Sequence, residues 1–480
     1  MKNGVQLITY PDSLGGTISG LSDVLERYFP GAFSGVHLLP FYPSSADRGF
    51  APVSYNLVDP AFGTWAEVEA LARRYDVTVD FMVNHISRQS PEFLDYREKG
   101  GMSPWGDLFL QVRKIFPDGE IPPSELGKIY TRKPRAPVTE VLHPDGTVDT
   151  LWCTFSEEQI DLDVTSDTGR RFIESNIRSL CRRGIAMLRL DAFAYVTKRA
   201  GTNCFFVEPE VWDVLSRIRR VADEYGVQLL PEIHEHYSYQ LKLAEKGYRV
   251  YDFALPMLML HTLYTRSTRR LKEWLSICPR NQVTTLDTHD GLGVVDAVDL
   301  LTKDELDAAV DNLYHRGSSV NRRYSTAEYN NLDIYQINCT YYSALGEDDD
   351  AYILSRAVQF FAPGIPQVYY VGALSGRNDT ELVERTKQGR DINRHSYSVD
   401  ELEGELQRPV NRRLQELLTF RSAAEVFDGD FEVLESGETE LVIRRTGKAG
   451  GEAVFTADLK TLACRIDHTS ADGSRESIKC

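Results

Sequence analysis

Eight short apolar runs recur along this chain, and most of them are followed by a segment with the apolar spacing of a helix. Nearly continuous apolar residues are typical of strands that are covered on both faces of a parallel sheet. Eight strand–helix units predict an α/β fold of the (β/α)8 TIM-barrel class. The expected strands are Val5–Tyr10, Gly35–Phe41, Val77–His85, Ala186–Asp191, Val227–His234, Val250–Ala254, Gln282–Asp290 and Ile365–Val371.

Two insertions interrupt the alternation, and the pattern changes again near the end of the chain. Short alternating runs separated by Gly after about Ala424 indicate a small all-β domain. The two insertions follow strand ends that carry polar residues, so we expect them to overhang the site. The predicted limits are 1–85, 166–290 and 352–424 for the barrel, 86–165 and 291–351 for two inserted subdomains, and 425–480 for the terminal β-domain.

The overall charge and the cysteine usage exclude several classes of function. A formal charge of −17 disfavours a nucleic-acid or membrane partner, because both require a positive surface. The seven scattered cysteines contain no CxxC, so neither a disulfide framework nor a zinc site is expected and a reducing cytoplasm fits best. No signal peptide or membrane span is expected at the sequence level. We expect a monomer or a homodimer that acts on small molecules.

Arg189 and Asp191 end the apolar run that begins at Gly184, and they share one face of the expected strand. The guanidinium group favours an ionised, nucleophilic carboxylate beside it. A pair that only closes a strand end is the structural alternative. Glu232 and Asp290 stand at the ends of two further expected strands. Three carboxylates at one mouth of a barrel suit glycosidic cleavage, in which one attacks, one exchanges protons and one stabilises positive charge.

These segments resemble the conserved regions of the α-amylase superfamily, glycoside hydrolase family 13, and in particular its sucrose-phosphorylase branch. The motifs are Val5–Asp12, Arg189–Ala192, Asp287–Gly291, Pro366–Gly372 and Gly389–His395, and the resemblance covers essentially the whole chain. It implies a barrel with two inserted subdomains and a β-domain, without a cofactor or metal. An Asp/Asn-rich calcium loop does not stand out, and Glu347–Asp350 is more simply the acidic first turn of a helix.

Carried over by position, the resemblance implies that Asp191 is the nucleophile, Glu232 the general acid/base and Asp290 the transition-state stabiliser. The residues that would surround the glucosyl unit are Asp47, Phe50, His85, Arg189, Tyr195, His289 and Arg394. The implied reaction is reversible phosphorolysis with retention, which yields α-D-glucose 1-phosphate through a covalent glucosyl-enzyme.

The acceptor side combines features of two kinds of enzyme within this branch. Candidate acceptor- and phosphate-binding residues are Arg132, Lys133, Arg135, Phe155, Gln159, His234, Asp333, Tyr335 and Gln336. Three cations within four positions suit a phosphorylated fructose, although a charged loop can also be simply solvated. The interpretation favours sucrose 6′-phosphate as donor, together with sucrose.

Several alternatives stay open at this point. The chain could be a phosphorylase of plain sucrose, of glucosylglycerol or of glucosylglycerate, because acceptor loops rather than the fold determine that choice. A sucrose hydrolase or transglucosidase would use the same scaffold without phosphate. A non-catalytic binding protein is disfavoured, because Asp191, Glu232 and Asp290 are all present.

Overall fold

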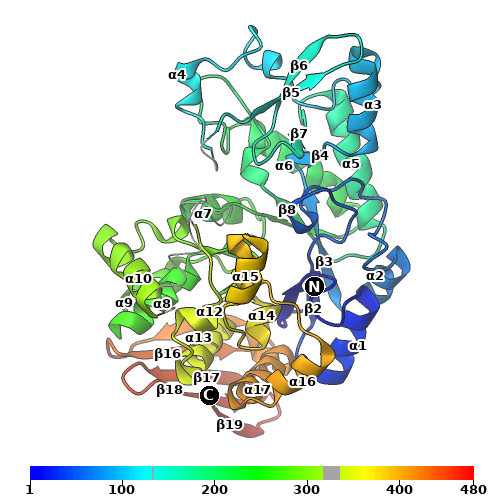
Figure 1. The fold of residues 1–480 in the computed structure, drawn as a ribbon. Coiled ribbons are helices and arrows are strands. Elements are labelled where there is room, and N and C mark those ends of the chain that lie inside the picture. The colour runs from blue at the N-terminus through cyan, green and yellow to red at the C-terminus, as the bar shows by residue number, and fades with distance from the viewer. Residues whose placement is uncertain (132–134, 317–335) are drawn as a thin grey trace. The chain divides into compact units, whose positions relative to one another are not determined.

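The computed structural model describes residues 1–131, 135–316 and 336–480, and Figure 1 shows the course of the chain. These residues form two compact units. The first comprises Met1–His37 and His234–Cys480, and the second comprises Leu38–Ile233.

The parallel strands of the first unit follow one another in the order β10, β11, β14, β1 and β2. Leu7 lies opposite Val368, and Val283 lies opposite Ile365, with all four side chains buried. The strands span Gln6–Thr9 (β1), Gly35–Leu38 (β2), Val250–Asp252 (β10), Gln282–Thr284 (β11) and Ile365–Tyr369 (β14).

Helices surround these strands, and α13 is buried from Ala351 to Phe361. The Asp348 side chain caps α13 by accepting from the Ala351 amide, and Asp349 and Asp350 occupy the first turn. This confirms the prediction of an acidic helix start, where the positive end of the helix dipole favours carboxylates. The helices of this unit are α1 (Ile18–Tyr28), α7 (Ser238–Glu245), α8 (Leu255–Thr265), α9 (Arg269–Ile277), α10 (Lys303–Arg316), α12 (Tyr341–Ala344), α13 (Asp349–Phe361), α14 (Tyr370–Ala373), α15 (Thr380–Thr386), α16 (Val399–Leu406) and α17 (Pro409–Ala423), with 3-10 turns η5 (Val295–Ala297), η7 (Gly389–Asn393) and η8 (Glu425–Asp428).

A five-stranded antiparallel sheet ends the chain, where the sequence predicted a small all-β domain. Ile443, Phe455 and Ile466 lie in one row across it and are buried, which gives each strand its alternating pattern. α13 packs against β17 and β18 through contacts such as that between Phe361 and Phe455. The strands are β15 (Asp430–Leu434), β16 (Glu440–Thr446), β17 (Glu452–Asp458), β18 (Ala463–Thr469) and β19 (Arg475–Lys479), and a separate two-stranded ladder pairs β12 (Leu292–Gly293) with β13 (Gln336–Ile337).

The second unit contains three further parallel strands, in the order β3, β8 and β9. Asp80 lies opposite Arg189, and Met82 lies opposite Asp191. These strands span Asp76–Met82 (β3), Met187–Asp191 (β8) and Gln228–Pro231 (β9). The helices of the unit are α2 (Trp65–Ala72), α3 (Pro91–Lys99), α4 (Pro123–Leu126), α5 (Asp167–Cys181) and α6 (Glu210–Asp223), with 3-10 turns η1 (Asp47–Gly49), η2 (Gly100–Met102), η3 (Val112–Lys114) and η4 (Phe193–Tyr195).

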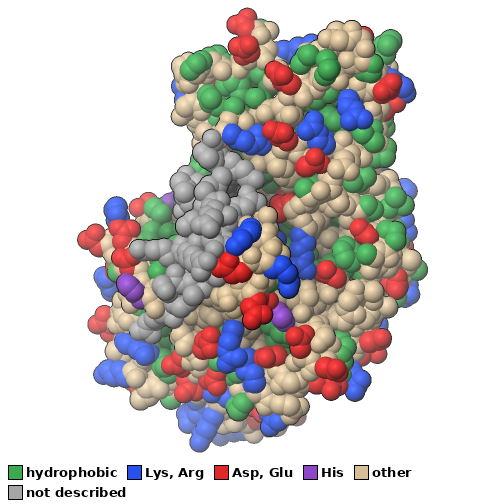
Figure 2. Space-filling model, in the orientation of Figure 1, with side chains coloured by type: hydrophobic (Ala, Val, Ile, Leu, Met, Phe, Trp, Pro, Cys, Tyr) green, Lys and Arg blue, Asp and Glu red, His purple; other side chains and the backbone are tan. Residues whose placement is uncertain are grey.

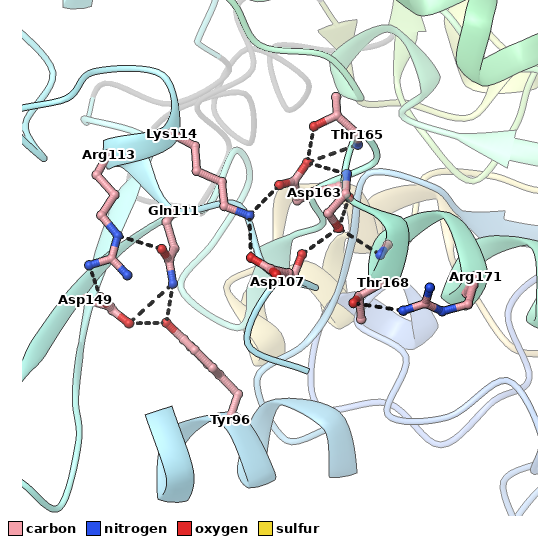
Figure 3. A network of polar contacts seen from close by, with 12 residues as sticks. Tyr96, Asp107, Gln111, Arg113, Lys114, Asp149, Asp163, Thr165, Thr168 and Arg171 are labelled. Carbon is pink, nitrogen blue, oxygen red and sulfur yellow. Dashed lines mark hydrogen bonds and ion pairs between the residues drawn. The ribbon is translucent and has the colours of Figure 1, made fainter. Parts of the chain in front are cut away.

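The first insertion contains two antiparallel ladders and a polar network of its own. Strands β4 (His85–Ser87) and β7 (Gln159–Asp161) pair in one antiparallel ladder, and β5 (Val138–Leu142) pairs with β6 (Val148–Trp152) in another. Figure 3 shows Lys114 between Asp107 and Asp163, while Tyr96, Gln111 and Arg113 converge on Asp149. Because these polar groups are paired, the segment can be ordered despite its high content of charge.

The eight parallel strands confirm the predicted (β/α)8 barrel with a C-terminal all-β domain. All eight strands are shorter than the predicted runs. The largest differences lie at their ends: β2 ends at Leu38 rather than Phe41, β3 at Met82 rather than His85, β9 at Pro231 rather than His234, and β11 at Thr284 rather than Asp290. Beyond β3, His85 already begins β4, whereas the residues that follow β9 and β11 lie in loops. The predicted domain limits stay predictions.

Two further observations concern nucleic-acid and membrane partners. Figure 2 shows acidic and basic side chains interspersed over the face that it draws. No helix among the described residues is long and apolar enough to cross a membrane.

Candidate active site

Arg189 connects three carboxylates within the second unit. Its Nη1 lies 2.5 Å from Asp80 Oδ1 and 2.9 Å from Asp191 Oδ1, and its Nη2 lies 3.8 Å from Glu232 Oε1. The side chain of Asp80 is fully buried, whereas those of Asp191 and Glu232 remain 14% and 12% exposed. Strand alternation places Arg189 and Asp191 on one face, as the sequence predicted. The arrangement leaves two partly accessible carboxylates beside one buried cation.

The backbone at the end of β8 holds Glu232 in a different way. Ala192 adopts a left-handed conformation with φ 51° and ψ 31°, and its amide donates to Glu232 Oε2 at 2.9 Å. A left-handed conformation costs an L-residue on the order of 1 kcal/mol, and such strain is often found at functional sites. Glu232 Oε2 therefore accepts from a neutral donor, whereas Asp191 Oδ1 pairs with a charged one.

His85 begins β4 and is buried in a polar pocket. Its Nε2 lies 2.9 Å from the Phe50 carbonyl oxygen and 3.1 Å from Gln159 Nε2. Burial lowers the pKa of His85, which favours the neutral imidazole. Gln159 also donates to the Phe50 carbonyl at 3.1 Å. The structure thus brings together Phe50, His85 and Gln159, three of the predicted site residues.

An aromatic group adjoins this pocket. The Phe155 ring lies 5.3 Å from His85 and 5.2 Å from Tyr195, between ring centroids, and Tyr195 packs edge-on against Phe205 at 5.0 Å. The Arg189 guanidinium lies 5.8 Å from the Phe50 ring centroid. Aromatic faces of this kind suit the C–H groups of a sugar ring, and Phe155 and Tyr195 form an apolar wall beside His85 in the second unit.

The loop that contains Asp47 has an unusual backbone. Asp47 and Arg48 have positive φ values of 52° and 46°. This conformation is sterically costly for residues other than Gly, although Asp and Asn adopt it more readily than most. The folded chain maintains it immediately before Phe50.

In the first unit, Asp290 lies among cationic and amide groups. Its Oδ1 is 3.2 Å from Arg390 Nη1, and its Oδ2 is 3.5 Å from His289 Nε2. Asn393 donates to the Asp290 carbonyl at 3.1 Å, and Arg394 donates twice to the His289 carbonyl, at 3.1 and 3.0 Å. The structure therefore groups Asp290, His289 and Arg394, which the sequence placed on segments about a hundred residues apart.

His234 and Gln336 also lie in the first unit. The His234 ring stacks on Phe253 with centroids 3.8 Å apart, and its Nδ1 is 3.4 Å from Asp296 Oδ2. Gln336 is buried and pairs with Gly293 in the β12–β13 ladder.

Five predicted acceptor-side residues remain, and of these the structure describes only Arg135. Arg132, Lys133, Asp333 and Tyr335 lie outside the described residues. Arg135 is half-buried, and its Nη1 lies 3.3 Å from the Ala136 carbonyl oxygen and 3.6 Å from Cys153 Sγ. Arg135 Nη2 is buried without a hydrogen-bond partner among the described residues.

Sequence reasoning missed three buried charges next to predicted site residues. Asp80 pairs with Arg189, and Asp296 pairs with His234. Lys198 joins Asp161 and Asn84 beneath His85, and its side chain is 2% exposed. Each could have been suspected as a charged residue within or beside an apolar run, because buried charges are rare unless they are paired or functional.

The side chains themselves supply the charges that balance these carboxylates. Asp191 faces Arg189, Asp290 faces Arg390, and Asp161 faces Lys198. An arrangement of carboxylates with guanidinium and ammonium groups suits polar sugar and phosphate ligands.

Comparisons with known proteins agree with this chemistry. The family model of the α-amylase catalytic domain matches residues 5–284. A sucrose phosphorylase of Streptococcus mutans is 53% identical over 467 residues, which cover 97% of each chain. A glucosylglycerol phosphorylase of Marinobacter adhaerens is 46% identical, with 100% of both chains covered.

A solved structure resembles the whole chain. The crystal structure of the sucrose 6F-phosphate phosphorylase from Thermoanaerobacter thermosaccharolyticum matches with a TM-score of 0.95 at 42% identity, covering 100% of this chain and 98% of that one. The chain therefore belongs to the α-amylase family, glycoside hydrolase family 13, and within it to the branch of the sucrose phosphorylases.

Proposed function

We propose that this chain is a retaining phosphorylase that transfers the α-glucosyl group of sucrose to inorganic phosphate, giving fructose and α-D-glucose 1-phosphate. The observation that carries the proposal is the arrangement of Asp191 and Glu232 around Arg189. Glycosyl transfer with retention needs one ionised carboxylate and one that exchanges a proton. The 53% identical relative bears the name of a sucrose phosphorylase.

In the first displacement, an Asp191 oxygen attacks the anomeric carbon while Glu232 gives its proton to the departing fructosyl oxygen. The glucosyl group is then bound covalently to Asp191, and Glu232 is ionised. In the second displacement, a phosphate oxygen attacks the same carbon, breaks the bond to Asp191 and gives its proton to Glu232. Two inversions yield net retention.

Asp290 stabilises the positive charge that develops on the sugar in both steps. The residues proposed to bind the glucosyl unit are Asp47, Phe50, His85, Tyr195, His289 and Arg394.

Sucrose 6′-phosphate is a second candidate donor, and Arg135 favours it. The buried Nη2 of Arg135 has no partner among the described residues, so an anion could use its N–H groups. The solved relative with a TM-score of 0.95 is titled a sucrose 6F-phosphate phosphorylase. Arg132 and Lys133 would add to the positive charge of the same segment.

The decisive experiment measures glucose 1-phosphate release, with and without phosphate, from sucrose, sucrose 6′-phosphate and glucosylglycerol in parallel. The proposal expects phosphate-dependent release and a higher kcat/KM for sucrose than for glucosylglycerol. Release of free glucose at the same rate with and without phosphate would instead identify a hydrolase. The Asp191→Asn variant serves as the inactive control.

A variant of Arg135 tests which donor the segment around this residue binds. If Arg135→Ala lowers kcat/KM for sucrose 6′-phosphate by at least tenfold and for sucrose by less than threefold, the cationic segment binds the fructosyl phosphate. Equal losses would assign Arg135 to inorganic phosphate or to folding. A thermal-unfolding measurement on the same variant separates these two explanations.

A further inference from the structure

Asp296 is a buried carboxylate that the proposed mechanism does not use. It lies in the 3-10 turn η5, is 1% exposed and directs Oδ2 toward His234 Nδ1 at 3.4 Å. Its Oδ1 is buried and has no hydrogen-bond partner among the described residues. Within those residues the imidazole of His234 is the group that ion-pairs with Asp296. A buried carboxylate is costly without a counter-charge, so this environment favours a protonated His234.

The surrounding backbone is shaped to allow this pair. A Cβ atom on Gly293 would lie 2.1 Å from Asp296 Oδ2, closer than any contact can be. Only glycine at this position of β12 therefore lets the carboxylate reach its place. The same hypothetical Cβ would lie 3.5 Å from His234 Nδ1, so the strand, the carboxylate and the imidazole are close together. Gly293 also pairs with Gln336, the second described acceptor-side residue of this unit.

His234 is held from a second side by aromatic stacking. Its ring lies nearly parallel to Phe253, at an interplanar angle of 18°, and Phe253 stacks in turn on Tyr251 with centroids 4.5 Å apart. The stack fixes the plane of the imidazole, and Asp296 fixes its rotation by engaging Nδ1. Nε2, on the opposite edge of the ring, is then the nitrogen that would meet an acceptor.

We propose that Asp296 is a positioning residue that holds His234 as an imidazolium whose Nε2–H binds an oxyanion of the phosphate group. The inference rests on the proposed phosphorolysis and deepens it, because it assigns recognition of the phosphate to this buried pair. A cationic donor at this place strengthens binding of inorganic phosphate and glucose 1-phosphate, and it contributes much less to binding of a neutral donor such as sucrose.

The test compares Asp296→Asn with the wild type through separate KM values for phosphate, glucose 1-phosphate and sucrose. Asn keeps an oxygen acceptor of the same size and removes the negative charge. We expect KM for phosphate and for glucose 1-phosphate to rise at least tenfold, with KM for sucrose within threefold of the wild type. Gly293→Ala, which pushes the carboxylate away without removing it, should reproduce this split.

Asp299→Asn is the matched control. Asp299 belongs to the loop that follows η5 and pairs with another histidine, His236, at 3.1 Å, but its side chain is 77% exposed. The same substitution there should leave all three KM values unchanged. An unchanged phosphate KM in Asp296→Asn, or an equal rise for sucrose, would overturn the proposal for Asp296. If the wild type itself released no glucose 1-phosphate, the proposed function would fail instead, so the two failures are distinguishable.

Discussion

Asp252 should make the stability of this protein depend on pH in an unusual direction. It ends β10, is 1% exposed and accepts hydrogen bonds from Trp274 Nε1 at 3.0 and 3.2 Å, from the Leu255 amide at 3.0 Å and from Gln282 Nε2 at 3.2 Å. Burial nevertheless raises the pKa of Asp252 to about 6, because these neutral donors offset only part of the lost hydration.

The size and sign of the effect follow from linkage. An Asp in the unfolded chain has a pKa of about 3.9, so the difference is about 2 pKa units, or about 3 kcal/mol. Between these two values the folded state binds the proton more tightly than the unfolded state does. The free energy of unfolding should therefore fall as the pH rises from about 4 to about 6 and level off above that. About 2 kcal/mol of this loss develops between pH 4 and pH 7.

Asp252→Asn removes the titration while keeping the shape of the side chain. The substitution has its own fixed cost or gain, since the Asn amide faces the Gln282 amide nitrogen. That fixed amount cancels when one protein is compared with itself at two values of pH. The variant should therefore lose about 2 kcal/mol less stability than the wild type between pH 4 and pH 7.

Urea denaturation at half-unit steps from pH 4 to pH 7 measures this difference. Asp23→Asn, which removes an exposed carboxylate from α1, is the control and should follow the wild-type curve. If wild type and Asp252→Asn gave parallel curves, Asp252 would titrate alike in the folded and unfolded states, and the reasoning from burial would be refuted.

Two further predictions concern the site and its support. Glu232→Gln should slow transfer to phosphate by at least a hundredfold while sparing azide attack on an activated glucosyl donor, since azide needs no general base; equal losses in the two assays would argue against the acid/base role. Gly372→Ala should destabilise the fold by about 3–5 kcal/mol in urea titrations, because the added Cβ would lie 2.1 Å from Arg356 Nη2 and 2.2 Å from Asp287 Oδ2, which form a buried ion pair. Gly404→Ala on α16 is the control. Its added Cβ would meet nothing within 4 Å, so this substitution should stabilise the helix slightly.

The barrel could be predicted from the sequence because its signal is repeated. Each apolar run alone is ambiguous between strand and buried helix, but eight of them in alternation leave few architectures. The ends of the runs were less predictable. Only three residues of the predicted run Gln282–Asp290 form a strand. Beyond them, Asp287 and His289 are buried because their polar side chains are paired, and they take no part in the sheet.

The candidate site was predictable where a motif marks it and obscure where a distant partner completes it. Arg189 and Asp191 are two residues apart, so strand alternation alone places them together. Asp80 is 109 positions from Arg189, and its role appears only when β3 and β8 pair. Asp296 is 62 positions from His234 and depends on the absence of a side chain at Gly293. Neither relation leaves a local pattern in one sequence.

The difference between the two carboxylates of the second unit arises from the backbone as much as from Arg189. Asp191 lies 2.9 Å from the guanidinium and Glu232 lies 3.8 Å from it, so the cation interacts more strongly with Asp191. The left-handed turn at Ala192 supplies Glu232 with a neutral amide donor instead. The division of labour that we propose for Asp191 and Glu232 thus depends on where β8 ends.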